Sequence, residues 1–570
     1  MKPSFVVVVA GAGLLGAAVF VWVFGLGVLD VRQTGWMIHG DSAQHYLGWA
    51  FFRTAEWQWP LGLVSNFGYP FKTTLAFTDS IPLVALPLKL LSPWLPLDFN
   101  YFGWWMAACM VGNAMAAANL LAKVGLSRIA VLAGATLFSF TPCMMLRAYG
   151  HESLMAQGLL LLALNLSMVP RQQAAFKGSA WLSLLAVCAL VHPYFLVMVC
   201  ALFAATLVQS CLNVRNLTPL RAAGWLLAGL ALSVSVLYSL GYFESSGKTL
   251  SAVGYPNYSA NLLTWLDPID WHWFLTQYQR DPTGSAQWSL WLPPLGQADR
   301  DQYEGFAYLG AGMLLLGGVA LWAALLQKKP NKGVNSATKY CADRQRLWGW
   351  PVWGWPVWAA LGLMAIYALS SKLTLGSWVL LDVPTSPAVH KVLSIYRACG
   401  RFIWPLTYAL MLWSLVQLVR FRPQVQWAWV LLALGLQVSD LSGKMEEFHS
   451  LYSPARPYAT PLTDPTWDVA LQKATHLVVL EDTSKSEDWV AFSFLAAKHG
   501  VVNSTGLISR VDESQQMAWL QNQKRGVLAG QPMPGYVYVS RDELPELKGW
   551  VRHHLNGWWL LTSATPNAAP

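Results

Sequence analysis

Apolar residues recur in long blocks from residue 5 to about residue 440, and short polar segments separate them. The first block, residues 5–29, exceeds the roughly 20 residues that a helix needs to cross a ~30 Å hydrocarbon core. Spans in lipid must satisfy their own backbone hydrogen bonds, so we expect helices. The pattern predicts eleven spans, at residues 5–29, 101–122, 129–146, 153–169, 178–191, 193–212, 223–241, 305–326, 352–370, 402–419 and 425–439.

Two stretches of this pattern leave alternatives open. The blocks 178–191 and 193–212 meet at His192-Pro193 and could form one broken helix. Residues 81–97 are apolar but interrupted by prolines, and counting them as a span would move the basic loop 123–128 to the opposite side. We therefore expect residues 81–97 to be interfacial or re-entrant.

The charges orient the bundle. Of 570 residues 55% are hydrophobic and 12% are charged, whereas average globular chains carry about 25% charged residues. The net charge of +9 does not indicate a nucleic-acid partner, because the basic residues lie in short loops on one side. These loops, which we expect to be cytoplasmic, are 123–128, 171–177, 215–221, 328–346 and 420–422.

The predicted fold class is an all-α polytopic membrane bundle of about 11 helices in residues 1–442, followed by a small α/β domain. Long outer loops cover residues 30–100, 242–304 and 371–401. The composition shifts after Gly443, and residues 443–570 are expected on the outer side. Within this domain the pattern predicts strands at 476–480, 501–504 and 536–539 and a helix at 489–499.

Four groups of polar residues stand at the outer ends of spans, and all could converge on one site. Ionisable groups at membrane depth cost roughly 2.5–3.5 kcal/mol each, so those present usually serve a function. Asp79 and His192 belong to the same face. The groups are Asp41 with His39 and His45; Arg147 with His151 and Glu152; Tyr303 with Glu304; and Arg397 with Arg401.

Arg397 and Arg401 lie four residues apart, one turn of a helix, so both could point the same way. A guanidinium fork matches phosphate oxygens, which favours a phosphate ligand at the lipid headgroup level. The small neighbours Ala398, Cys399 and Gly400 would let a bulky ligand approach. Two snorkelling arginines that contact lipid headgroups are the alternative.

Asp41 is a candidate general base, because transfer to a hydroxyl needs a carboxylate near the acceptor proton. The alternative is structural, since Asp41 could cap a helix over residues 42–56. Asp79 is a second candidate base, in a sequence context that also suits a turn.

The remaining candidates are less specific. His151-Glu152 could bind substrate hydroxyls or begin a helix, and Tyr303-Glu304 could mark a membrane entry point. His192-Pro193 is favoured as a structural turn. The sequence contains no motif typical of a cofactor site. Its seven cysteines do not have the spacing of metal ligands. A divalent metal site built from Asp41, His45 and Glu152 stays open.

Short motifs resemble a bacterial branch of the GT-C superfamily, the membrane glycosyltransferases that use lipid-phosphate-linked sugars. They are Gly40-Asp41-Ser42-Ala43-Gln44-His45, Tyr303-Glu304-Gly305 and Arg397-Ala398-Cys399-Gly400-Arg401-Phe402, with the C-terminal outer domain as a further likeness.

The resemblance implies an inverting transfer from an undecaprenyl-phosphate sugar, or a similar polyprenyl donor. The reaction would take place at the periplasmic face of the bacterial inner membrane. The acceptor would be a periplasmic glycan, lipid or protein. Asp41 matches the catalytic aspartate of the family's first loop. Family members often carry a second acid beside it, whereas Ser42 follows here, which leaves metal use open.

Two other functions compete with this expectation. A transporter or flippase for a lipid-linked glycan predicts ionisable residues in mid-span, whereas the candidates here lie at span ends. A non-catalytic envelope assembly protein predicts that Asp41 and the two arginines lie apart in space.

Overall fold

The structure is a computed structural model that describes residues 3–168, 176–213, 217–244, 253–270, 287–325, 353–454, 457–483, 486–507 and 512–564. The expected cytoplasmic loop 328–346 lies outside the described residues, as do most of loop 171–177 and residues 215–216 of the loop 215–221. Part of the outer loop 242–304 lies outside them as well.

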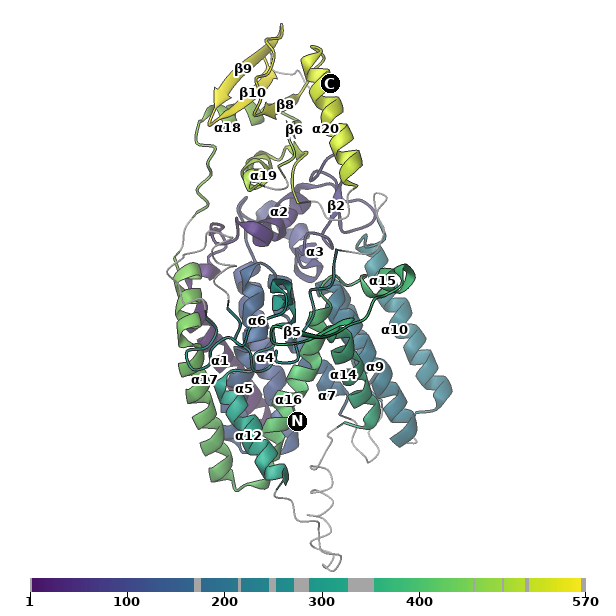
Figure 1. Cartoon of the computed structure of the whole chain (residues 1–570). Helices are drawn as coiled ribbons and strands as arrows, with labels where there is room; N and C mark the ends of the chain where they lie inside the picture. The colour runs from purple at the N-terminus through teal and green to yellow at the C-terminus, as the bar shows by residue number, and fades with distance from the viewer. Residues whose placement is uncertain are drawn as a thin grey trace, which may run out of the picture.

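Each apolar block that was predicted to cross the membrane contains helix. The helices are α1 (Pro3–Phe24), α4 (Phe102–Val124), α5 (Arg128–Ser139), α6 (Pro142–Met145), α7 (Gly158–Leu166), α8 (Gly178–Val191), α9 (Pro193–Asn213), α10 (Pro219–Ser239), α12 (Ala311–Leu325), α14 (Trp355–Leu369), α16 (Trp404–Gln417) and α17 (Pro423–Tyr452). They pack side by side into one bundle (Figure 1).

Six segments in the described part of the chain are long and apolar enough to cross a membrane. They are Phe5–Phe24, Phe102–Val124, Arg128–Tyr149, Pro193–Leu212, Pro219–Ser239 and Cys399–Arg420. Four shorter apolar helices accompany them. The chain is therefore a multi-pass membrane protein, and the count of eleven spans stays a prediction.

The two open stretches now have definite forms. α8 and α9 are separate helices that pack against each other, because His192 between them adopts an extended conformation with φ −165° and ψ 137°. Residues 82–91 form the ten-residue helix α3 (Pro82–Leu91), which is too short to cross a bilayer. A short 3-10 turn, Ser92–Trp94, follows it.

The C-terminal region forms a five-stranded sheet in the order β7-β6-β8-β10-β9. Its strands are β6 (His476–Val479), β7 (Val502–Asn503), β8 (Tyr536–Ser540), β9 (Trp550–Leu555) and β10 (Trp558–Ser563). β6 pairs in parallel with β7 and β8, and β10 pairs antiparallel with β8 and β9. The helices α18 (Thr466–Leu471), α19 (Asp488–His499) and α20 (Glu513–Leu528) accompany the sheet.

The predicted strands and the 489–499 helix are present, and the β9–β10 hairpin was missed. Its turn is Asn556-Gly557, with φ of 51° and 78°. Asn-Gly between apolar runs is a strong signal for a two-residue hairpin, because both turn residues need positive φ. The sequence therefore contained the signal for this hairpin.

The first outer loop joins this sheet at its edge. It contains α2 (Gly40–Thr54) and the short pair β1 (Leu63–Val64) and β2 (Thr73–Thr74). Phe67 pairs in parallel with Asn503 of β7, and the Tyr69 N–H donates to the Asn503 carbonyl at 2.9 Å. α19 packs on α2, so the sheet domain lies on this loop at one end of the bundle (Figure 1).

The later outer loops add small elements at the same end. These are β3 (Val253–Pro256), a 3-10 turn at Arg300–Gly305, the hairpin β4 (Lys372–Leu375) and β5 (Trp378–Asp382), α15 (Pro387–Leu393) and a 3-10 turn at Cys399–Ile403.

Candidate active site

Asp41 lies in the first turn of α2, near the junction with the bundle. The N-cap position belongs to His39, whose backbone is extended at φ −161° and ψ 146°. The structural alternative, in which Asp41 caps this helix, is therefore wrong, and the helix begins two residues earlier than predicted. The Asp41 side chain remains 51% exposed, so its carboxylate is accessible to a ligand.

Gly48 brings α2 against the loop that carries Asp79. A Cβ at Gly48 would overlap the Thr78 side chain and lie 2.5 Å from Ser80 Oγ. Ser80 Oγ in turn donates to the His45 carbonyl at 2.7 Å. Because His45 precedes Gly48 by three residues, it lies on the same helix face and meets the same loop.

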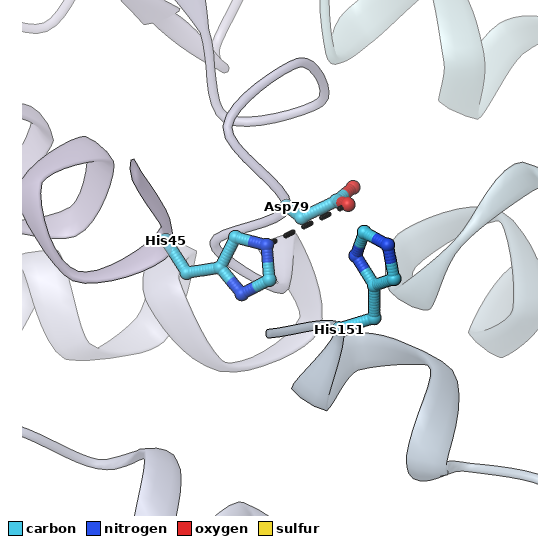
Figure 2. Close-up of side chains that lie close together, drawn as sticks. All are labelled: His45, Asp79 and His151. Carbon is cyan, nitrogen blue, oxygen red and sulfur yellow. Dashed lines mark ion pairs between the residues drawn. The ribbon is translucent and has the colours of Figure 1, made fainter. Parts of the chain in front are cut away.

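The His45 ring joins two carboxylates. Its Nδ1 lies 2.6 Å from Glu152 Oε2. On the other side of the ring, its Nε2 lies 3.8 Å from Asp79 Oδ2 (Figure 2). Ser42 Oγ donates to the other Glu152 oxygen at 2.7 Å. Burial alone would lower the pKa of His45, but the carboxylates of Glu152, Asp79 and Asp41 together outweigh this effect and raise it.

His192 completes this side of the site. Its Nε2 lies 3.3 Å from Asp79 Oδ1, while its Nδ1 accepts from the Tyr194 N–H at 3.2 Å. An Nδ1 that accepts leaves Nε2 to carry the proton toward Asp79. The interpretation of His192 as a turn residue alone is thus incomplete, because the same imidazole contacts a site carboxylate.

Asp79 adopts the turn conformation that its sequence context suits. Its backbone is left-handed at φ 52°, as in a turn, and so is that of Ile81 at φ 49°. A β-branched residue at such a φ is strained, and strain of this kind gathers at functional sites. Burial would raise the pKa of Asp79, but the His192 and His45 imidazoles hold it well below its ordinary value.

A buried ion-pair cluster forms the second half of the site. Glu304 accepts from Arg401 at both oxygens, at 2.9 Å from Nε and 2.6 Å from Nη2. Arg147 Nη1 lies 2.6 Å from Glu304 Oε2. Burial would raise the pKa of Glu304, but Arg401 and Arg147 hold it well below its ordinary value. One carboxylate between two guanidiniums leaves an excess of one positive charge.

Two glycines bring the partners of this ion pair together. A Cβ at Gly400 would lie 2.7 Å from Gly305 Cα, and one at Gly305 would lie 2.5 Å from the Ser259 carbonyl. Glu304 and Arg401 flank this close approach. The small run at 398–400 is buried and serves backbone packing, so the expectation that it opens space for a ligand is wrong.

Arg397 and Arg401 do not share a helix face, contrary to expectation. Arg397 precedes the 3-10 turn Cys399–Ile403, and its side chain is exposed. Its Nη2 donates to Tyr258 OH at 2.8 Å, and the guanidinium lies 4.8 Å from the centre of the Tyr258 ring. Tyr303 packs edge-on against the same ring at 6.1 Å. Arg397 is therefore the accessible cation and Arg401 the buried one.

His151 links the two halves. Its Nε2 lies 3.9 Å from Asp41 Oδ2 and 3.9 Å from Glu304 Oε1. Its ring stacks 6.3 Å from that of His45. Gly150, at φ 124°, allows this approach, since a Cβ there would already touch the Asp41 Cβ at 3.4 Å. Burial, followed by the Arg401 charge, holds the pKa of His151 well below its ordinary value.

Asp41 therefore faces charges of both signs. Desolvation by the surrounding protein raises the pKa of its carboxyl group, and the His45 and Arg397 charges offset part of the increase. A carboxylate with a raised pKa is a stronger base. The arrangement provides an accessible base beside an accessible cation.

Three groups could hold a metal ion. Nitrogen atoms of His45 and His151 and an oxygen of Asp79 lie within 4.8 Å of one another (Figure 2). The sequence pointed to Asp41, His45 and Glu152 as possible metal ligands. Glu152 instead contacts Nδ1 of His45, the ring nitrogen on the side away from Asp79. A carboxylate behind a metal-ligating histidine is a common arrangement. His151 Nδ1 is buried without a hydrogen-bond partner in the described structure.

Most of the predicted residues thus meet in space. The structure brings together Asp41, His45, Asp79, Arg147, His151, Glu152, Glu304 and Arg401, with Arg397 and Tyr303 beside them. His39 stands at the helix N-cap instead. Tyr258 and Ser42 were missed, since neither has a sequence signal.

Asp440 serves the fold rather than this cluster. Its carboxylate accepts from Tyr308 OH and from the Ala311 N–H at the start of α12, both at 2.8 Å. It also accepts from the Ser289 hydroxyl. A carboxylate at a helix N-terminus satisfies free backbone N–H groups.

Comparison with protein families gives a match over most of the chain. Residues 13–442 match the family described as "Domain of unknown function (DUF6311)". The chain belongs to this family. Residues 466–560 match the associated "DUF6311 C-terminal domain". A comparison with curated proteins gave no match for the DUF6311 chain.

Three solved structures of the oligosaccharyltransferase from Archaeoglobus fulgidus are similar at low identity. The complex with Zn and sulfate is 11% identical, with a TM-score of 0.41, over 93% of this chain and 67% of that one. The AglB complex with an inhibitory peptide and a dolichol-phosphate is 12% identical, with a TM-score of 0.42, over 95% of this chain and 69% of that one. The apo form is 11% identical, with a TM-score of 0.42, over 95% of this chain and 70% of that one. TM-scores of this size do not establish a shared fold.

Proposed function

We propose that this DUF6311 protein is an integral-membrane glycosyltransferase that moves a sugar from a polyprenyl-phosphate donor to an acceptor hydroxyl. The observation that carries the proposal is the approach of Asp41 and Glu304 to one imidazole, at 3.9 Å each, with Arg401 bound to Glu304. Base and cations lie within one cluster at the end of the bundle that bears the sheet domain.

Asp41 acts as the general base of an inverting transfer. The acceptor oxygen attacks the anomeric carbon and gives its proton to the Asp41 carboxylate, while the bond from that carbon to the donor phosphate breaks. The accessible carboxylate and its raised pKa support this role. His151, whose Nε2 lies 3.9 Å from Asp41 Oδ2, packs beside the carboxylate and limits its positions.

Arg397 binds the donor phosphate directly. It is exposed, and the charge of Arg397 acts on the Asp41 carboxyl group. Arg401 and Arg147 support the same phosphate through the excess positive charge that Glu304 leaves. Fixed cations stabilise the charge that develops on a phosphate leaving group.

The donor set His45, Asp79 and His151 fits a divalent metal. Such an ion, when bound, would neutralise phosphate charge as a Lewis acid. Glu152 then fixes the orientation of His45, and His192 fixes that of Asp79.

The protein resides in the bacterial inner membrane, with the site facing the periplasm. Residues 1–442 form the catalytic module, and residues 443–570 contribute to the choice of a glycan, lipid or protein acceptor. The contact of the sheet edge with the loop that carries Asp41 supports this division.

The test is turnover of polyprenyl-phosphate sugars by purified protein, followed by mass spectrometry of the products. Asp41→Asn should lower kcat by about 10²–10⁴-fold, the range for loss of a general base, with unchanged donor affinity. Asp30→Asn, an exposed residue of the same loop, is the matched control. Full activity of the Asp41 variant contradicts the assignment. Movement of intact donor across vesicles, without release of its sugar, favours a flippase instead.

The phosphate role has its own test. Arg397→Ala should weaken donor binding by about 1.5–3 kcal/mol, the range for hydrogen bonds to charged groups. Arg32→Ala, an exposed arginine elsewhere on the outer side, should leave it unchanged. Equal donor affinity in both variants contradicts phosphate binding by Arg397.

A further inference from the structure

The segment between α14 and Arg397 exposes an unusual amount of apolar surface. β5 runs Trp378-Val379-Leu380-Leu381-Asp382, and every one of its side chains is exposed. Trp378 is 73% exposed and Val392, on the following α15, is 64% exposed. Further exposed apolar residues of this segment are Leu375, Val379, Leu380, Leu381, Val383, Val389 and Ile395.

This pattern does not suit a strand in water. Side chains alternate between the two faces of a strand, and a sheet with one wet face carries polar residues on it. β5 carries four consecutive apolar residues, so both of its faces are apolar. In the described structure it pairs with β4 alone. Such an edge in water would be an aggregation site.

The segment is held firmly in this exposed position. Asn261 clamps the hairpin turn, since its Nδ2 donates to the Gly376 carbonyl at 2.8 Å and its Oδ1 accepts from the Gly376 N–H at 2.9 Å. Tyr367 OH of α14 donates to the Leu393 carbonyl of α15 at 2.7 Å. The apolar surface is therefore a fixed feature of the fold.

Its position matches the end of a membrane helix. The segment begins directly after α14, whose Leu363 and Ile366 are exposed and apolar as expected for a lipid-facing side. The hairpin begins at Lys372, just after α14 ends at Leu369, and α15 lies above α14 in Figure 1. A tryptophan at that level and a lysine, Lys391, on α15 suit the headgroup region.

We propose that the exposed apolar side chains of residues 375–395 are embedded in the outer lipid leaflet, with acyl chains covering both faces of β5. The segment follows directly on α14, whose exposed side is also apolar, and this favours lipid over a second protein as its occupant. The surface ends two residues before Arg397. A second step rests on the proposed function: the polyprenyl chain of the donor lies along this surface as its phosphate reaches Arg397.

Spin labels test the embedding independently of any activity. Leu380→Cys is labelled in the full chain and reconstituted in vesicles of phosphatidylethanolamine and phosphatidylglycerol, with the label on unsubstituted protein subtracted. Leu363→Cys on α14 is the lipid-facing control, and Leu528→Cys on α20 is an exposed control away from the bundle. Collision rates with oxygen and with a water-soluble nickel chelate are measured.

The label at residue 380 should behave as the one at 363, with fast oxygen collisions and slow chelate collisions. Chelate access equal to that at residue 528 overturns the proposal. Exclusion of both reagents also overturns it, because that result indicates cover by protein.

The second step is tested with donors that differ in chain length. Leu380→Asp should raise KM at least tenfold for a donor with a long polyprenyl chain and leave KM unchanged for a two-isoprene analogue. Leu528→Asp should change neither value. Equal KM values for variant and wild type, or an equal rise for both donors, overturn this step. If wild type turns over neither donor, the proposed function fails while the spin-label result stands.

Discussion

At the scale of single residues, the site depends on charges that are buried in opposite pairs. Glu304 has 3% of its surface exposed and Arg401 has 6%. Such groups tolerate burial only because each is paired and hydrogen-bonded. Arg147 and Arg401 also lie over the Trp404 and Tyr194 rings, at 5.2 Å and 4.8 Å from the ring centres. The pairing of Glu304 with the two arginines fixes the position of the excess positive charge in the site.

Glu304→Gln should destabilise the protein strongly. It removes the one negative charge between two buried guanidiniums, and loss of one partner of a buried pair costs about 3–5 kcal/mol. Thermal unfolding in detergent measures the effect. Glu543→Gln is the matched control, because its pair with Arg552 is exposed on the sheet domain and such pairs contribute about 0–1 kcal/mol. Similar losses in both variants would contradict the role of the buried pair.

The same carboxylate predicts a dependence of stability on acid. The two guanidiniums hold the pKa of Glu304 well below its ordinary value of 4.5. A lowered pKa in the folded state stabilises the protein fully above pH 4.5, and this contribution is lost as the pH falls below that value. The melting temperature of wild type should therefore fall more steeply below pH 4.5 than that of Glu304→Gln. Parallel curves would show that Glu304 does not carry this stability.

At the scale of elements, close backbone approach positions the chemistry. α2 meets the loop 78–80 through Gly48, and the turns that carry Glu304 and Arg401 meet through Gly305 and Gly400. A Cβ at any of these positions would force the neighbouring segments apart. Each glycine thus permits a close approach between segments that carry charged residues of the site.

Gly48→Ala should damage the site while the bundle stays folded. The added Cβ overlaps Thr78 and Ser80, and overpacking costs about 1–3 kcal/mol. The displaced helix takes His45 away from Asp79, so activity should fall at least tenfold. Gly112→Ala in α4 is the matched control, since its Cβ meets nothing within 4 Å. A more stable Gly48→Ala protein with full activity would contradict this account.

Sequence patterns predicted the secondary-structure elements better than they predicted the contacts between side chains. The long apolar blocks located every helix of the bundle, because a helix that spans lipid needs a long apolar run. The same pattern did not foresee that Arg401 is buried while Arg397 is exposed, since the 3-10 turn Cys399–Ile403 breaks the helical spacing. It placed His45 and Asp79 on one face but not in contact, because that contact depends on Gly48 and the left-handed Asp79 backbone.

At the scale of the whole molecule, the sheet domain and the loop that carries Asp41 form one structure. Residues 66–69 extend the sheet at β7, and the Tyr46 ring stacks 6.5 Å from that of Phe494 on α19. Gln44, between Asp41 and His45, donates to the Leu507 carbonyl at 2.6 Å and to the Phe77 carbonyl at 3.2 Å. One amide therefore ties α2 to the sheet domain and to the loop that carries Asp79.

Gln44→Ala should loosen this connection and slow catalysis without weakening donor binding, because the amide touches neither Arg397 nor its neighbours in the described structure. Amide exchange at Tyr69 and Asn503 should quicken, and kcat should fall about tenfold while donor affinity holds. Gln521→Ala, exposed on α20, is the control. Exchange that stays slow beside a reduced kcat would assign Gln44 to the chemistry itself. Exchange that quickens beside an unchanged kcat would show that the sheet domain does not position Asp41. Faster exchange together with a lower kcat is the joint outcome expected if the sheet domain holds α2, and with it Asp41, in position.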